Sequence, residues 1–190
     1  MNKLVAFLTF SFFLINVPVR AITIDFEAQG ASAPSAFTGT LNSPLTIGIA
    51  TFRGGQLLKN EAGGADLSVV YATSGGTPYL DPLTVTFSQP VSGFSLVVTN
   101  NVPDTYTVAD NLGGSQSLAL NANVAQIFNL GGAAITSVSI SSATNVFWDF
   151  AIDNVIYSPV SAAVPEPTTL ASLGGVLLSG VLLLLRRRHE

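Results

Sequence analysis

The sequence predicts an all-β protein, an antiparallel jelly-roll-like β-sandwich of about ten strands. Segments rich in β-branched and aromatic residues recur at intervals of roughly 8 to 14 residues, separated by Gly-Gly, Asn and Pro. No segment between Ile22 and Val160 shows a helical period. Only 9% of the residues are charged, and Ser, Thr, Asn and Gly are abundant, which is typical of a sheet protein with many turns.

Ten segments carry the strand signal. The first three are apolar runs with alternating polar positions. The fourth, 83–87, alternates most cleanly, and we expect Gln89-Pro90 to end it because proline cannot donate a ladder hydrogen bond. The predicted strands are 22–28, 45–52, 67–72, 83–87, 93–100, 106–110, 115–120, 126–130, 135–141 and 145–157.

The later segments are defined by their faces and turns. In 93–100 the side chains of Phe94, Leu96 and Val98 share one face. Residues 111–114, Asn-Leu-Gly-Gly, predict a hairpin turn between 106–110 and 115–120. Gly131-Gly132 separates the next two strands, and 145–157 is the longest predicted strand.

The N-terminus has the pattern of a secretory signal peptide over residues 1–21. Lys3 supplies a positive charge, residues 4–17 are apolar, and Val19-Arg20-Ala21 is a small-residue cleavage site. We therefore expect export and cleavage after Ala21. The alternative is an uncleaved N-terminal anchor, for which the apolar stretch is short.

The C-terminus combines three features in order. Residues 159–169 form a Pro-rich linker, and its prolines exclude helices and central strands. Residues 170–185 are apolar and uncharged, and as a helix they would span roughly 24 Å of a bilayer core of about 30 Å. Residues 186–190 form a basic tail, whose Arg186, Arg187 and Arg188 stop translocation and hold that end in the cytoplasm. The apolar run therefore predicts a single transmembrane helix.

This tail resembles the PEP-CTERM sorting signal, with Pro165, Glu166 and Pro167 as its motif. The resemblance implies an exported protein of a Gram-negative bacterium that makes extracellular polysaccharide. It implies a partner, an exosortase-like transpeptidase of the membrane that cuts at or near the motif. The body would first stand in the periplasm on an inner-membrane anchor and then reach the cell surface or extracellular matrix. The alternative is an ordinary, permanent membrane anchor.

Charge and composition exclude several functions for the body, residues 22–158. Five of the seven basic residues lie in the terminal segments. Residues 22–167 therefore contain ten acidic residues and only two basic ones, Arg53 and Lys59, which gives a net charge of about −8. Such a domain repels nucleic acid. The chain has no Cys, and its one His is His189, so the body has no thiol catalysis, no Ser-His-Asp triad and no His-ligated zinc.

Four acids on the first and last strands are expected to meet. Asp25 and Glu27 share a strand face, as do Asp149 and Asp153, and terminal strands of jelly rolls often lie side by side. Ca²⁺ would relieve the repulsion because it binds carboxylate and carbonyl oxygens. The alternatives are solvated acids at a sheet edge and, less favoured, the carboxylate pair of a secreted glycosidase.

The opening Ile-Asp-Phe-Glu (24–27) and closing 150–157 segments also resemble the first and last strands of galactose-binding-like β-sandwiches. In that family a structural calcium uses an acid on the first strand and an acid near the last. Glu27 and Asp153 stand at the matching positions, so the resemblance implies a structural Ca²⁺ site there.

The main functional prediction is a non-enzymatic exported protein of the cell surface or extracellular matrix. The alternative is a carbohydrate-binding module for exopolysaccharide, in which aromatic rings stack on sugars. Tyr79 and Tyr106 flank turn residues and are the surface candidates, whereas Trp148 shares a face with Phe150 and Ile152 and is expected in the core.

Overall fold

The computed structural model describes residues 20–33, 44–59, 69–73, 82–144 and 150–160, which all fall within the unit Val19–Val160. The predicted PEP motif, apolar run and basic tail lie outside these residues, as does the signal peptide except for Arg20 and Ala21. Within the described ranges no helix has the length and hydropathy needed to cross a bilayer.

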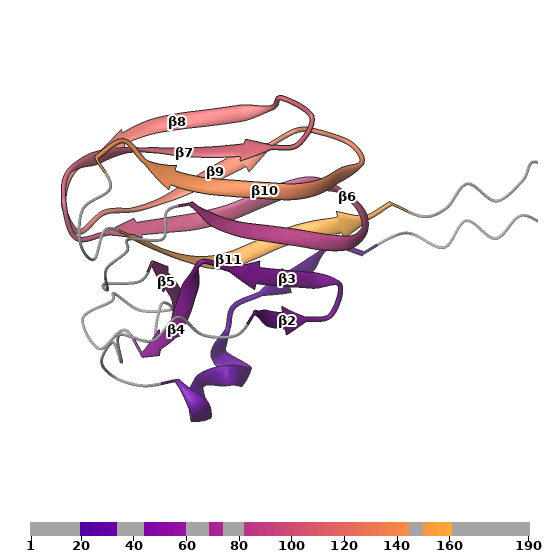
Figure 1. The fold of residues 1–190 in the computed structure, drawn as a ribbon, viewed down its shortest axis with the longest axis horizontal. Helices are drawn as coiled ribbons and strands as arrows, with labels where there is room; N and C mark the ends of the chain where they lie inside the picture. The colour runs from indigo at the N-terminus through magenta and orange to yellow at the C-terminus, as the bar shows by residue number, and fades with distance from the viewer. Residues whose placement is uncertain (1–19, 34–43, 60–68, 74–81, 145–149, 161–190) are drawn as a thin grey trace, which may run out of the picture. The chain divides into compact units, whose positions relative to one another are not determined.

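The described residues form strands and one short 3₁₀ helix, η1 (Figure 1). Every strand pairing is antiparallel, so the predicted all-β, antiparallel class is confirmed. The elements are β1 Ile22–Ile24, η1 Glu27–Ser32, β2 Leu45–Ile47, β3 Ala50–Arg53, β4 Gly55–Lys59, β5 Val69–Thr73, β6 Leu83–Asn100, β7 Asp104–Asp110, β8 Ser115–Leu120, β9 Ala125–Leu130, β10 Ile135–Ser142 and β11 Phe150–Pro159.

The strands form two layers, named here by their central strands. The β10 layer runs β2-β3-β6-β10-β7-β8, and Figure 1 shows these strands one above another. The β11 layer runs β4-β5-β11-β6-β9, with β1 paired to the end of β11. Both layers contain β6, so a single hydrogen-bonded network folds over itself into a sandwich.

The long strand β6 joins the layers by changing partners halfway. Residues 83–87 pair with β3 and β10, whereas Phe94–Asn100 pair with β9 and β11. The change occurs across an exposed stretch, Ser88 to Pro90, and Gly93 with φ of 60°. The predicted strand end at Gln89-Pro90 is therefore wrong: proline is tolerated at an irregular position, and the register of β10 against β6 shifts there.

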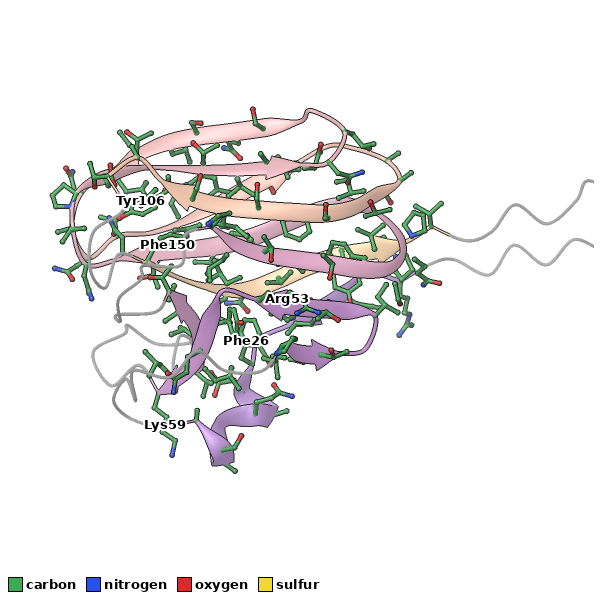
Figure 2. The ribbon with its side chains drawn as sticks, in the orientation of Figure 1. Phe26, Arg53, Lys59, Tyr106 and Phe150 are labelled. Carbon is green, nitrogen blue, oxygen red and sulfur yellow. The ribbon has the colours of Figure 1, made fainter. Side chains whose placement is uncertain are left out.

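The core lies between the layers and is rich in aromatic rings. Phe52 of β3 lies 5.6 Å from Tyr71 of β5, measured between ring centroids, and Phe26 packs against both. At the other end Tyr106 of β7 meets Phe150 of β11 edge to face, with ring centroids 5.4 Å apart. Both residues are labelled in Figure 2. These contacts join the two layers, and edge-to-face and tilted pairs are favoured by the ring quadrupoles.

The predicted strands also differ from the structure in the first part of the body. The segment 45–52 is a hairpin of β2 and β3, because Gly48 with φ of 59° allows a tight turn inside the apolar run. The strand expected over 22–28 ends at Ile24, because Phe26 is left-handed and η1 begins at Glu27. The edge strand β4, which pairs with β5, was missed because its short sequence includes Gly55 and Gln56.

Candidate functional site

The pairing of β1 with β11 brings the predicted acids together. Ile22 pairs with Tyr157 and Ile24 with Val155, so the chain leaving β1 passes beside Asn154 and Asp153. The expected adjacency of the terminal strands is thus confirmed. Glu27 does not lie on the strand, however, but opens η1 after the turn at Phe26. Two of the four described non-glycine residues with positive φ, Phe26 (φ 58°) and Asn154 (φ 48°), directly adjoin the acids.

Asp153 is a buried carboxyl group in an apolar setting. Its side chain is 0% exposed, and its strand position pairs with Val97 of β6. Oδ1 accepts a hydrogen bond from the Asn154 N–H at 2.7 Å, whereas Oδ2 is buried without a hydrogen-bond partner. The pKa of Asp153 is raised to about 7. Burial is the main cause, the hydrogen bond from Asn154 opposes it, and the carboxylates of Glu27 and Asp25 add to the rise.

Glu27 and Asp25 are exposed acids at the surface of the same region. Glu27 Oε1 accepts a hydrogen bond from the Val69 N–H at 3.0 Å, which ties η1 to the start of β5. Asp25 Oδ1 accepts the Glu27 N–H at 3.2 Å. The alternative of solvated acids is therefore wrong for Asp153, which is buried. It holds for Glu27 and Asp25, which are exposed. Asp149 lies outside the described residues.

A calcium ion suits the donors at this site in part. Carboxylate oxygens are the ligands that Ca²⁺ prefers, and the orphaned Asp153 Oδ2 is the kind of buried atom that a cation would satisfy. In the described ranges, however, no three Asp, Glu, His or Cys side chains converge closely enough to hold a metal. Glu27 and Asp153 would therefore need backbone carbonyls or water to complete the coordination shell.

The aromatic residues offer no stacking platform in the part of the chain that the structure describes. All of its Phe and Tyr side chains are buried, and Tyr106, predicted to lie at the surface, is 0% exposed. Its hydroxyl donates to the Val102 carbonyl at 3.1 Å, which anchors the corner before β7. The surface prediction for Tyr106 is therefore wrong. Tyr79 and Trp148 lie outside the described residues.

A surface that the sequence analysis missed lies on the outer side of the β10 layer. Short hydroxyl side chains alternate with buried apolar ones along its strands, for example Thr84 and Thr86 beside Leu83, Val85 and Phe87. The same alternation recurs as Ser-x-Ser in β10 and as Thr-x-Thr in β7. In β8 the exposed Ser115 and Ser117 flank the half-buried Gln116. This repeat of hydroxyl-bearing residues at every second position is the sequence signal from which the surface could have been predicted.

The comparisons with known proteins give only weak structural similarities. No family model matches the chain, and no curated protein matches it. Among solved structures, a family 29 carbohydrate-binding module from Piromyces equi has 6% identity and a TM-score of 0.41, covering 77% of this chain and 94% of the module. A mutant module of that family has 9% identity and a TM-score of 0.41, covering 74% and 93%. Another mutant, complexed with cellulohexaose, has 11% identity and a TM-score of 0.40, covering 74% and 93%.

Proposed function

We propose that the chain is a non-catalytic exported protein of the cell surface or extracellular matrix, delivered by its C-terminal sorting signal. The observation that carries the proposal is the order of the tail in the sequence: Pro165-Glu166-Pro167, an apolar run over 170–185, then three arginines. The tail follows β11, which ends at Pro159, so the motif stands a few residues beyond the last strand.

An exosortase-like transpeptidase is the proposed processing partner. The inner membrane would hold the apolar run while the body stands in the periplasm, and cleavage near Glu166 would release the sandwich. Replacing the motif by alanine (Pro165→Ala, Glu166→Ala, Pro167→Ala) should leave full-length protein in the inner-membrane fraction of the native host. The matched control, Thr168→Ala with Thr169→Ala, should be processed normally. Equal processing of both variants would contradict the proposal.

A non-catalytic role agrees with the acids that the structure describes. A glycosidase needs two carboxyl groups that both reach the scissile bond. Asp153 carries the raised pKa expected of a general acid, but its side chain is fully buried and therefore closed to a substrate in solution. Glu27 instead holds the backbone of β5. The pair is therefore suited to a structural role.

We further propose that Glu27 and Asp153 contribute to a structural Ca²⁺ site. Binding requires the ionised form of Asp153, whose pKa is about 7, so calcium should raise the melting temperature more at pH 8 than at pH 6. Asp153→Asn should abolish the calcium-dependent shift, whereas Asp104→Asn, on β7, should retain it. No shift on adding calcium to the wild type at pH 8 would rule the site out.

Binding of extracellular polysaccharide is the second candidate function. The similar solved structures are carbohydrate-binding modules, but a TM-score of 0.41 is too low to transfer a ligand from them. What favours this function is the hydroxyl-lined outer surface of the β10 layer in the chain itself. Binding of the detergent-solubilised full chain to immobilised polysaccharide would test it, and the absence of binding to any neutral polysaccharide would contradict it.

A further inference from the structure

The outer surface of the β10 layer, called here the hydroxyl face, presents short polar side chains over all six of its strands. Its members are exposed or half-buried, and most of them alternate along their strands with neighbours that are buried or less exposed, which indicates that they point away from the core. The hydroxyl-bearing members are Thr46, Thr51, Thr84, Thr86, Thr105, Thr107, Ser115, Ser117, Ser137, Ser139 and Ser141. Figure 2 shows oxygen-tipped side chains standing on β6, β8 and β10.

The strand register aligns these side chains into rows across the sheet. One row crosses four strands, from Thr46 through Thr51 and Thr86 to Ser137. The next row crosses five strands and consists of Arg53, Thr84, Ser139, Ala109 and Ser115. A third joins Ser141, Thr107 and Ser117. Neighbours in a row are about 4.8 Å apart and successive rows about 7 Å apart, so the hydroxyls form a lattice.

Hydrogen bonds within the rows hold several hydroxyl groups in place. Thr46 Oγ1 and Thr51 Oγ1 are 3.0 Å apart, and Thr107 Oγ1 and Ser117 Oγ are 2.7 Å apart. The Thr86 hydroxyl donates to the Thr51 carbonyl at 3.4 Å. An ordered hydroxyl loses little rotamer freedom when it binds a ligand, which favours recognition.

The charge of the hydroxyl face differs from that of the body. Its rows contain no carboxylate and one cation, Arg53, although the body is strongly acidic. A nucleic acid would need several basic residues, and a protein partner would need large apolar or aromatic anchors. The rows have neither. A neutral chain of hydroxyl groups matches a surface of uncharged donors and acceptors, since each hydroxyl can donate one hydrogen bond and accept two.

We infer that the hydroxyl face binds a neutral polysaccharide chain that lies along the rows, across the strands. The inference rests on the second candidate function and assigns it a surface. Binding would depend on direct and water-mediated hydrogen bonds, without aromatic stacking. Because many weak contacts along a long polymer act together, oligosaccharides should bind much more weakly than the polymer.

The test uses the detergent-solubilised full chain in affinity electrophoresis through gels of soluble β-glucan, galactomannan or alginate. The double variant Thr84→Val with Thr86→Val replaces hydroxyls by methyl groups of equal size on β6. The matched control, Ser95→Ala with Thr99→Val, makes similar changes on the other half of β6, where the side chains belong to the β11 layer. Circular dichroism melting establishes that both variants are folded.

We expect retardation by a neutral polysaccharide and not by alginate, with affinity about tenfold lower in the Thr84/Thr86 variant and unchanged in the control. Equal retardation of both variants would overturn the hydroxyl face while leaving polysaccharide binding intact. No retardation of the wild type by any neutral gel would overturn both. A change of oligomeric state in the Thr84/Thr86 variant with unchanged retardation would assign the face to self-association and overturn the inference. None of these outcomes affects the proposed sorting, which processing of the tail tests separately.

Discussion

The outer surfaces of the two layers have different chemistry, although one strand, β6, contributes to both. In the β10 layer most outward side chains are short and hydroxyl-bearing, and they are exposed or half-buried. In the β11 layer several outward positions are buried and apolar, including Leu58, Val70, Ala72 and Ala151, and among them lies the buried Asp153. The helix η1 contacts β4 and β5 of this layer, and its flanking residues Phe26 and Ala33 belong to the main core with Val69 and Tyr71. The β10 layer thus exposes a surface to solvent, while the β11 layer has a second, partly covered apolar surface.

The same alternating sequence pattern can therefore place a polar side chain either in solvent or in a buried environment. Thr84 and Thr86 alternate with core residues and face solvent, whereas Asp153 follows Ile152 in the same alternation but is enclosed. A polar side chain at an outward position is therefore not always exposed to solvent. Its contribution to stability depends on whether it is enclosed. Substitutions of polar residues in the two layers should therefore change the free energy of unfolding in opposite directions.

The largest expected effect is at Phe26, whose ring packs against Phe52 of the β10 layer and Tyr71 of the β11 layer. Its side chain is 0% exposed, so Phe26→Ala should lower the free energy of unfolding by about 3–5 kcal/mol. Phe26→Leu should lose less because it leaves a smaller cavity. Urea denaturation measures both, and equal losses would show that the ring contacts do not hold the layers together.

The next effect contrasts two acids with opposite pKa shifts. The pKa of Asp153 is raised from 3.8 to about 7, so its contribution to stability is fully present below pH 4 and is lost as pH rises to 7. Without calcium, Asp153→Asn should therefore stabilise the protein at pH 8, by roughly 2–4 kcal/mol, and flatten the pH profile between 4 and 7.

Asp104 of β7 should behave in the opposite way. Burial acts to raise its pKa, but hydrogen bonds from the Thr144 side chain and from the Thr105 and Thr144 N–H groups prevail and lower it. Its contribution is thus present above pH 4 and lost as pH falls, so Asp104→Asn should destabilise the protein at pH 7. Melting temperatures in EDTA from pH 3 to 8 measure both variants. If both variants changed the melting temperature in the same direction at neutral pH, the contrast between the layers would be contradicted.

Two buried tyrosines allow a smaller, matched comparison. Tyr106 of the β10 layer donates its hydroxyl proton to the Val102 carbonyl, whereas the Tyr157 hydroxyl of the β11 layer is buried without a hydrogen-bond partner. Tyr106→Phe should cost about 1 kcal/mol, and Tyr157→Phe should be neutral or stabilising by about 1 kcal/mol. Chemical denaturation of the two variants decides the matter, and a loss in Tyr157→Phe would mean that its hydroxyl is satisfied.

The smallest effects on stability are expected on the hydroxyl face. Thr86→Val should change the free energy of unfolding by less than about 0.5 kcal/mol, because the side chain is exposed and valine favours strands equally well. A loss above about 1 kcal/mol in thermal melting would show that the face is built for stability and not for binding.

The sequence predicted most strands, because alternation in segments such as 83–87 and 135–141 reflects a half-buried sheet. It also predicted the hairpin at 111–114, where Asp110 Oδ1 accepts the Leu112 and Gly114 N–H groups at 2.8 Å. It did not predict that β6 continues through Pro90, because layer exchange depends on the register of distant strands. The local turn at Phe26 was hidden as well, since phenylalanine rarely adopts positive φ.

The candidate site was predicted in part. Pairing of the terminal strands placed Glu27 near Asp153, as expected. Alternation could not show that Asp153 is enclosed, because it indicates which face of the sheet a side chain is on and not whether that face is covered. Tyr106 was misplaced for a similar reason. Turn residues precede it, but in β7 it alternates with Thr105 and Thr107 and shares the buried face with Val108.

The most direct test of the proposed function is the intact mass of the mature protein isolated from its native host. The sorting account predicts an N-terminus at Ile22, the first residue of β1, and a C-terminus within or near Pro165-Glu166-Pro167. A mature chain that still ends at Glu190 would contradict processing and would assign residues 170–185 to a permanent anchor.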